Sequence, residues 1–330
     1  MGRTPVSLRI GRSASGLALV VMAVTVLEQA AWEALEATHA ARVDAVTAGH
    51  RERRRTGTAH PVEDFLFTYY PFKPAQLRRW HPGPGVVLEG ASHLDRGGWR
   101  FYREEQGGSR LDAAAFQQAR GATVAFVRRL VSATSSRPAQ LGCFGLHEWA
   151  MVYRQSAEEV RHAAWPLRLG SGGTDEVVDV LQLRCTHFDA FRFYTPPARP
   201  LNLLQPSRDD QVALEQPGCL HAGMDLYKWC MKLAPAVPSD LTFQCFQLAR
   251  EIRELDMRAS PYDLTALGYQ PVAIETPQGR AEYAAAQRDF ATRGQGLRER
   301  LLQALDAIDG GYSTESAVPV ERVSSSARMR

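Results

Sequence analysis

The sequence contains little lysine and lacks several motifs that would identify a reaction. Only Lys73, Lys228 and Lys232 are lysines among its 39 basic residues, so arginine carries most of the positive charge, as the codons of a GC-rich genome would produce. The alternative explanation of the high arginine content is a phosphate-binding site built from arginines. There is no GxxxxGK phosphate loop and no GxSxG elbow, which removes the usual sequence signals of a P-loop nucleotide binder and of an α/β-hydrolase.

Cysteine is also scarce, and its five positions include no CxxC pair. An odd number of cysteines without that spacing argues against a secreted disulfide framework. The number and spacing of the cysteines are more typical of a cytoplasmic protein whose thiols stay reduced. With 45% hydrophobic residues over 330 positions, the chain is not intrinsically disordered, and its net charge of +3 is too small to indicate a nucleic-acid binder by itself.

Long apolar runs are rare. The run 16–27 follows three arginines, as at the start of a signal peptide, but no small-residue cleavage site follows and the run is too short to cross a bilayer. We therefore expect residues 1–25 to be a poorly specified, disordered leader. The body of the protein is predicted to be soluble, with no membrane partner.

The remaining sequence predicts a mostly helical α+β single domain over residues 26–309, with a small antiparallel sheet, followed by a disordered Ser-rich tail at 310–330. Apolar spacing and the positions of Pro and Gly predict helices at 26–55, 111–134, 146–165, 222–233, 241–257 and 280–308, with a short helix near Phe65. Alternating hydrophobic residues predict strands at 86–89, 99–103 and 176–185.

Four histidines are considered together, because each has a carboxylate one to four residues after it. The pairs are His60 with Asp64, His147 with Glu148, His187 with Asp189, and His221 with Asp225. Imidazole and carboxylate are the ligands of zinc and of non-haem iron. This pattern supports a metal-dependent enzyme, either an iron oxygenase or oxidase or a zinc hydrolase acting on a small aromatic ligand. Its candidate metal ligands are His60, His147, Glu148, His187 and His221.

Each of these pairs also has a structural interpretation, as a surface ion pair or a helix cap. Three of the histidines follow a cysteine closely: Cys143, Cys185 and Cys219. These thiols can be small buried residues, which is the usual role of a free cysteine. A thiolate nucleophile beside a histidine is the other possibility.

Aromatic and basic residues alternate in the segment 65–80, and the same mixture of residues occurs again at 191–194. The aromatic residues can belong to the core at helical spacing. Alternatively, aromatic faces beside positive charges can stack a flipped nucleotide and hold its phosphates, or form the pocket of a small aromatic ligand.

Several strings resemble a family of actinobacterial proteins usually labelled 3-methyladenine DNA glycosylase. The strings are HPVEDFLFTYY (60–70), RRWHPG (78–83), GCFGLHEW (142–149), CTHFDAFR (185–192), PGCLH (217–221) and DMRASPYD (256–263). The resemblance covers about residues 26–305. It implies a DNA repair hydrolase that breaks the N-glycosidic bond of an alkylated purine and needs no cofactor.

That activity would require aromatic faces for the flipped base and a carboxylate that activates water or stabilises the sugar cation. Under the resemblance, the candidates for catalysis are Asp189 and Asp225, oriented by His187 or His221. The candidates for stacking the base are Tyr69, Tyr70 and Trp80. DNA phosphates would be held by Arg78, Arg79 and Arg192. The metal-dependent enzyme is the competing hypothesis.

Overall fold

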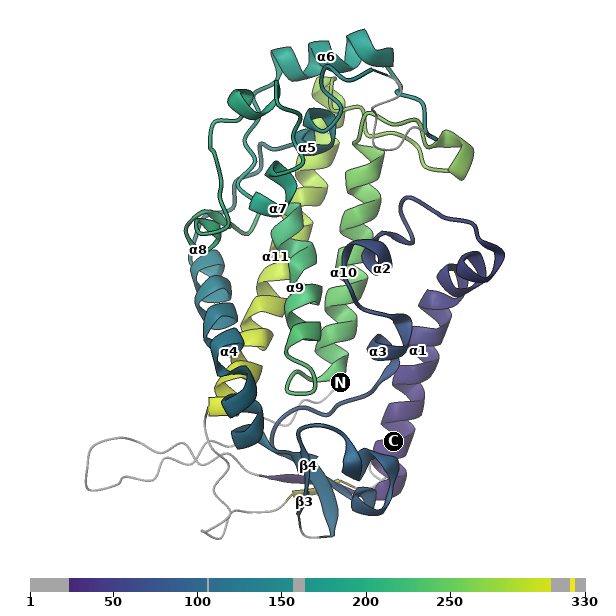
Figure 1. The fold of residues 1–330 in the computed structure, drawn as a ribbon, viewed down its shortest axis with the longest axis vertical. Coiled ribbons are helices and arrows are strands. Elements are labelled where there is room, and N and C mark those ends of the chain that lie inside the picture. The colour runs from purple at the N-terminus through teal and green to yellow at the C-terminus, as the bar shows by residue number, and fades with distance from the viewer. Residues whose placement is uncertain (1–23, 106, 157–163, 310–320, 324–330) are drawn as a thin grey trace, which may run out of the picture.

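The computed structural model describes residues 24–105, 107–156, 164–309 and 321–323. It has five long helices: α1 (Gln29–Thr56), α4 (Ala113–Ser135), α9 (Leu220–Lys232), α10 (Ser239–Arg258) and α11 (Pro277–Asp309). Helices α4, α9, α10 and α11 pack into a bundle, and α1 lies beside it against α10 (Figure 1). This bundle is the framework on which the other elements are placed.

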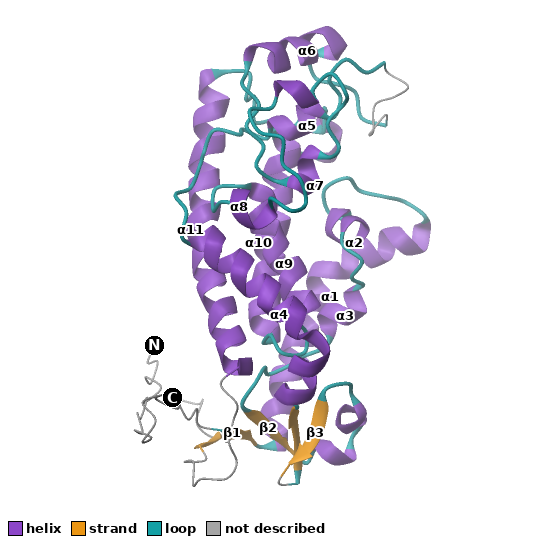
Figure 2. Ribbon diagram, turned by 60° about the vertical axis from the view of Figure 1, so that its left-hand side comes forward, coloured by secondary structure: helices purple, strands orange, loops and turns teal. Residues whose placement is uncertain are grey.

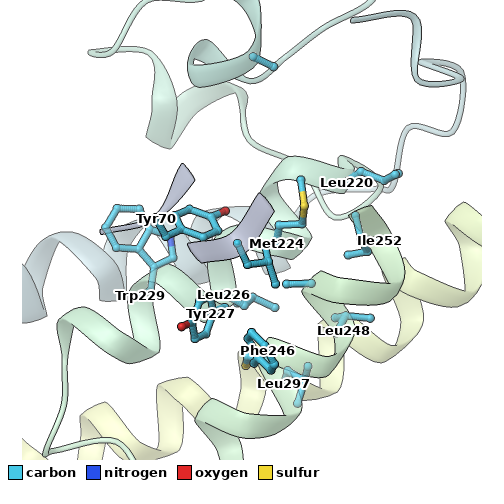
Figure 3. Close-up of a cluster of buried hydrophobic side chains, with 14 of the residues drawn as sticks. Tyr70, Leu220, Met224, Leu226, Tyr227, Trp229, Phe246, Leu248, Ile252 and Leu297 are labelled. Carbon is cyan, nitrogen blue, oxygen red and sulfur yellow. The ribbon is translucent and has the colours of Figure 1, made fainter. Parts of the chain in front are cut away.

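The bundle is held together by apolar side chains on the facing sides of its helices. Tyr227 on α9 and Phe246 on α10 are fully buried, with ring centroids 5.2 Å apart. Leu297 of α11 and Ile252 of α10 lie in the same cluster (Figure 3). Burial of a large aliphatic or aromatic side chain contributes about 1.5–3 kcal/mol, so this cluster is a main source of the stability of the bundle.

Local sequence signals set the helix ends. The Asp112 carboxylate accepts a hydrogen bond from the backbone N–H of Ala115 at 2.9 Å and caps α4. Gly57 adopts a left-handed conformation, with φ of 70°, and ends α1. Pro277 opens α11, and the backbone N–H of Gly279 donates to the Thr276 hydroxyl before it.

A small sheet lies at one end of the bundle (Figure 2). Its strands are β1 (Thr25–Leu27), β2 (Val86–Glu89), β3 (Tyr102–Glu105), β4 (Gly108–Leu111) and β5 (Glu321–Val323), and their spatial order is β3-β4-β2-β1-β5. Strands β2, β4 and β3 are antiparallel, whereas β1 pairs in parallel with β2 and β5. The predicted small sheet is present, but it is mixed rather than purely antiparallel.

Short elements surround the bundle. The short α-helices are α2 (Phe65–Tyr69), α3 (Pro74–Arg78), α5 (Leu146–Ala150), α6 (Gly170–Val180), α7 (Phe188–Phe191) and α8 (Gln211–Leu214). Single 3-10 turns occur at Ala91–His93, Asp95–Gly98, Arg199–Leu201 and Thr265–Leu267. Helices α5, α6 and α7 gather at the end of the bundle opposite the sheet (Figure 1). The loops between them bring distant parts of the chain to the ends of α9 and α10.

The predicted strand at 176–185 is wrong, because its first half, residues 176–180, belongs to helix α6. Thr174, Val177 and Val178 are buried, at the spacing of one helical face, and Val180 is 73% exposed. The alternation that favoured a strand began inside this helix. Leu183 forms only an isolated bridge, with Asn202.

The predicted helix at 146–165 is much shorter, because α5 ends at Ala150 and a turn follows. Trp149, Val152 and Tyr153 are all buried, and Arg154 has a φ of 54°, which a helix does not allow. The closely spaced apolar residues of this segment predicted a helix. In the structure the segment bends after Ala150 and buries these residues in a turn. Residues 157–163 lie outside the described part of the chain.

The predicted pairing of 86–89 with 99–103 is also wrong in its second strand. Strand β3 begins at Tyr102 and pairs with β4, and β4 in turn pairs with β2. Trp99 instead packs against the Arg96 guanidinium at 4.4 Å. Sequence alternation did not predict β4, because Gly108 and Ser109 have low strand propensity.

The other long helices are found where the sequence predicts them, and the mostly helical α+β fold is confirmed. Helix α1 starts at Gln29, because Val26 belongs to β1. The predicted leader and tail lie outside the described residues, except for 24–25 and the strand β5. Within the described ranges, none of the helices is both long and apolar enough to cross a membrane.

Candidate metal centre

Six buried side chains converge near the ends of α9 and α10, on the side away from the sheet. They are His147 on α5, His187 at the N-cap of α7, Glu215 directly after α8, His221 and Asp225 on α9, and Asp256 on α10. His221 and Asp225 are one helical turn apart, so α9 presents both on one face. The other four come from segments that the fold brings to this face.

The first group consists of His147, His221 and Asp256, whose potential ligand atoms lie within 4.8 Å of one another. The Nε2 atom of His147 is 2.9 Å from Oδ1 of Asp256, and the Asp256 side chain is fully buried. Burial opposes a charge on His147, but the Asp256 carboxylate outweighs this effect and raises the pKa of the imidazole. Two imidazoles and one carboxylate therefore face one another.

The second group consists of His187, Glu215 and Asp225, with the same mutual spacing. Nε2 of His187 lies 3.3 Å from Oδ2 of Asp225 and 3.4 Å from Oε1 of Glu215. The Tyr70 hydroxyl donates a hydrogen bond to Oδ1 of Asp225 at 2.7 Å, and Lys228 forms an ion pair with Oδ2. One imidazole thus lies between two buried carboxylates.

The two groups are adjacent, and His221 lies between the other imidazoles. Its ring centroid is 4.5 Å from that of His147 and 5.3 Å from that of His187. Burial, together with the charges of its two neighbours, lowers the pKa of His221 well below its ordinary value, so this imidazole is neutral. A neutral imidazole is the form that binds a metal.

His187 behaves oppositely to His221. Burial disfavours its charge, but Asp225 and Glu215 outweigh burial and raise the pKa of His187 to about 9. In addition to Lys228, a proton on His187 balances part of the negative charge of Asp225 and Glu215. A metal ion in the same position would replace that proton.

Two fixed cations, Lys228 and Arg253, border the centre. Nη1 of Arg253 lies 2.8 Å from Oε1 of Glu148 and 3.2 Å from Oδ2 of Asp256, and its guanidinium stacks on the Phe65 ring. Glu148, which the sequence predicted as a metal ligand, is therefore the ion-pair partner of Arg253. It contributes no ligand atom to either group.

A partly exposed rim adjoins the second group. Asp189 and Arg192 of the α7 segment form an ion pair at 3.4 Å, and Nζ of Lys228 lies 3.8 Å from Asp189. Burial and the nearby charges of Asp189 and Asp225 raise the pKa of Tyr69. The predicted residues Tyr69, Asp189 and Arg192 are thus brought together, one layer outside the buried groups.

His60 lies outside the centre. Its backbone N–H donates to Oδ2 of Asp64 at 2.8 Å, and the same carboxylate pairs with His50 and Arg53. The ring of His60 lies edge-on to Tyr269. The structural interpretation of the His60/Asp64 pair therefore describes these contacts better than metal ligation.

Trp80, Arg78 and Arg79 also lie apart from the centre. Trp80 is 8% exposed and packs with Trp32 and Leu88 near the sheet. Arg78 pairs with Asp44 on α1 at 3.0 Å, and Arg79 lies over the Trp99 ring. Of the residues predicted to stack a base, only Tyr69 and Tyr70 lie next to the predicted catalytic residues.

Sequence reasoning did not single out Glu215 or Asp256 as site residues. Asp256 stands at the start of the DMRASPYD string, in a helix whose neighbouring positions are apolar, and a buried carboxylate there is costly unless it has a partner. The position of Asp256 among apolar helix residues could therefore have indicated a buried site residue. Glu215 follows a four-residue helix in a loop and has no comparable local pattern.

Comparison of the chain with known protein families, curated proteins and solved structures found no match. The resemblance to proteins labelled 3-methyladenine DNA glycosylase therefore stays a prediction.

Proposed function

We propose that this protein is a metal-dependent enzyme, of the non-haem iron oxygenase or oxidase class, with its metal at the His/carboxylate centre. The observation that supports it is the convergence of three imidazoles and three carboxylates, all buried, in two groups with ligand atoms within 4.8 Å. Two histidines with one carboxylate, as in His147, His221 and Asp256, are a ligand set typical of non-haem iron. The two groups together provide ligands for one or two ions.

Charge supports this proposal. Four carboxylates, those of Glu148, Glu215, Asp225 and Asp256, are buried in one small region. Only Arg253 and Lys228 form ion pairs with them among the fixed cations of the described residues. Burying ionised carboxylates is expensive unless positive charge compensates them. The remaining positive charge comes from protons on His147 and His187, or from a divalent cation that replaces those protons.

The surroundings support a small substrate with an aromatic or acidic part. Tyr69 offers a partly exposed ring beside the Arg192 guanidinium, which is exposed. Tyr70 and Lys228 hold Asp225 from two sides and would fix the orientation of a ligating carboxylate. The metal would supply the activation of oxygen or water, and these residues position the ligands and the substrate.

Elemental analysis after expression with added iron, zinc or manganese tests the proposal. We expect about one equivalent or more of iron per chain, and its loss in His221→Ala and in Asp225→Asn. His60→Ala is the matched control and should keep the metal. Less than about a tenth of an equivalent of any of these metals in the wild-type protein would refute the metal centre. Stoichiometric zinc without iron would point to the hydrolase instead.

A second proposal, excision of an alkylated purine from DNA, rests on the resemblance. The observation in its favour is that Asp189, Asp225, His187 and His221 lie near Tyr69 and Tyr70. The distant positions of Trp80, Arg78 and Arg79 weaken it. Incubation of the purified protein with alkylated DNA should release free methyladenine, with and without a chelator, and Asp225→Asn should abolish the release. No release beside an active control glycosylase would end this proposal.

A further inference from the structure

An open pocket lies where the C-terminal end of α1 meets α2 and the start of α3. These short helices lie between α10 and α1 (Figure 1). The volume of the pocket, about 330 Å³, falls within the range of about 300–1,000 Å³ that is typical of sites for small organic molecules. Its lining residues include His50, Arg54, Phe67, Thr68, Phe72 and Lys73. None of them belongs to the His/carboxylate groups.

The basic residues of this pocket differ from their neighbours in having no acidic partner. Near the end of α1, Arg51, Arg53 and Arg55 each form an ion pair with a carboxylate. Arg54 and Lys73 are exposed and line the pocket, and neither forms an ion pair within the described part of the chain. The described lining also contains no carboxylate. The pocket therefore carries uncompensated positive charge, which favours an anionic ligand.

His50 adds a ring whose position is fixed. Its Nδ1 atom lies 2.9 Å from Oδ1 of Asp64, and its ring centroid is 4.4 Å from that of Phe67. Among the described residues nothing hydrogen-bonds to the other ring nitrogen, Nε2. Asp64 thus holds the imidazole in place and leaves Nε2 available to a ligand.

The aromatic side of the pocket is anchored to the helical bundle. The Phe67 ring packs against Phe246 of α10 at 5.5 Å between centroids, and the Phe72 ring packs edge-on against Tyr227 of α9 at 5.9 Å. Both phenylalanines are only partly buried, so each keeps some apolar surface toward the pocket. A wall that is already held in place costs little entropy when a ligand binds.

We propose that this pocket binds a small phosphate monoester that carries an aromatic ring. The phosphate would lie between Arg54 and Lys73, and the ring would lie against Phe67 and Phe72. A phosphate monoester has about two negative charges at neutral pH, so it matches two unpaired cations better than a carboxylate does. Single-stranded DNA needs a longer positive groove, and the neighbouring arginines of α1 are already paired. The inference does not depend on the proposed function, because the two sites share no residue.

Isothermal titration calorimetry of the full-length protein with 1-naphthyl phosphate tests the proposal. Inorganic phosphate, 1-naphthol and 1-naphthoate are the comparison ligands, which lack the ring, the charge and the second negative charge, respectively. We expect 1-naphthyl phosphate to bind at least about tenfold more tightly than inorganic phosphate or 1-naphthol, and several-fold more tightly than 1-naphthoate.

Variants of the two cations place the binding in this pocket. Arg54→Gln and Lys73→Gln should each weaken the binding of 1-naphthyl phosphate about tenfold, because each removes a charge-assisted hydrogen bond. Arg55→Gln is the matched control, since it removes the same charge one residue away from an arginine that pairs with Glu52. Its affinity should stay within about twofold of the wild type. Circular dichroism of each variant checks that the exposed substitutions leave the fold intact.

Several results would overturn the proposal. Absence of binding at millimolar 1-naphthyl phosphate would do so, as would equal affinity for inorganic phosphate, for 1-naphthol or for 1-naphthoate. Equal weakening by Arg55→Gln would show attraction to the general positive charge of α1, and tighter binding of a single-stranded oligonucleotide would show a nucleic-acid surface instead. Asp225→Asn should bind the probe as the wild type does. Loss of binding in that variant would mean that the phosphate binds a metal at the His/carboxylate centre and not this pocket.

Discussion

Among individual residues, the contacts of Asp225 show how the buried centre is held in place. Oδ1 of Asp225 accepts a hydrogen bond from the Tyr70 hydroxyl, and Oδ2 pairs with Lys228 and His187. Burial opposes the charge of Asp225, but Lys228 and His187 outweigh it and hold the pKa of this carboxyl below its ordinary value. Asp225 is thus ionised at neutral pH.

Tyr70→Phe tests the hydrogen bond to Asp225. We expect the free energy of unfolding to fall by about 2 kcal/mol, because a buried hydrogen bond to a charged group is lost while the ring is kept. Urea denaturation followed by circular dichroism measures the change.

Tyr227→Phe is the control for this variant. The Tyr227 hydroxyl is buried nearby, and the described residues offer it no hydrogen-bond partner. Its removal should leave stability unchanged within about 0.5 kcal/mol or raise it. Equal losses in the two variants would contradict the role given to the Tyr70–Asp225 hydrogen bond.

At the scale of secondary-structure elements, the contact between α9 and α10 decides where the ligands stand. Gly223 lies between the two ligand positions of α9, and a Cβ atom there would meet Cδ1 of Ile252 on α10 at 2.8 Å. That distance is shorter than a carbon–carbon contact allows. The glycine therefore lets the two helices approach closely beside the centre.

Gly223→Ala should lower the free energy of unfolding by about 1–3 kcal/mol through overpacking. The measurement is denaturant unfolding of Gly223→Ala, Ile252→Val and the double variant. Since Ile252→Val removes the opposing methyl group, the double variant should be more stable than the sum of the single losses implies. Simple additivity would show that Gly223 and Ile252 do not compete for this space.

The link between the sheet and the bundle predicts a pH dependence. The backbone N–H of His81 donates to the side-chain hydroxyl of Ser239 at the start of α10, and the His81 carbonyl accepts from the Ser239 backbone N–H. Nδ1 of His81 lies 2.9 Å from the Tyr102 hydroxyl of β3. Burial, with the charges of Arg96 and Arg79, lowers the pKa of His81 to about 3. Below pH 6.5 the unfolded chain binds a proton at His81 that the folded chain does not, so stability falls as the pH falls from 6.5 toward 3.

Between pH 7 and pH 5.5, His81 should contribute a loss of about 1 kcal/mol in the free energy of unfolding. His81→Gln should remove this part of the pH dependence, whatever its effect at pH 7. Urea titrations of both proteins at the two pH values give the comparison. Parallel losses in the wild type and the variant would show that His81 is protonated in the folded state.

For the whole molecule, the His/carboxylate centre brings together segments that are far apart in the sequence. Its six side chains come from α5, the N-cap of α7, α9, α10 and the residue after α8. A ligand that binds only the folded state stabilises the entire fold. Under the proposed function, a bound metal would therefore stabilise the whole fold as well as take part in the chemistry.

With free iron at about a hundred times its dissociation constant, the folded state should gain about 2.7 kcal/mol. Thermal unfolding of the metal-loaded and chelator-treated protein measures this gain under anaerobic conditions. Asp256→Asn should reduce the gain, and His60→Ala should not. A melting temperature that is independent of metal would contradict the proposed centre.

The elements were predicted well wherever a local pattern corresponds to the final packing. Helix α10 keeps an apolar stripe along its length, and Asp112 marks the start of α4. The prediction was wrong at α6, because the alternating residues of 178–183 run across the end of a helix. It was also wrong after α5, where the apolar residues are buried in a turn and not on a helical face. Strand β4 was missed for a similar reason, because its neighbours in the sheet and not its own composition make it a strand.

The sequence by itself determined which residue types the site could use, namely histidines, carboxylates and cysteines close together along the chain. Only the tertiary structure decided which of them meet. His187 faces Asp225, 38 positions away, rather than its neighbour Asp189, and His147 faces Asp256 rather than Glu148. The physical reason is that residues adjacent in sequence point in different directions on a helix or turn, whereas packing of α9 against α10 and the α5 and α7 segments aims distant side chains at one point.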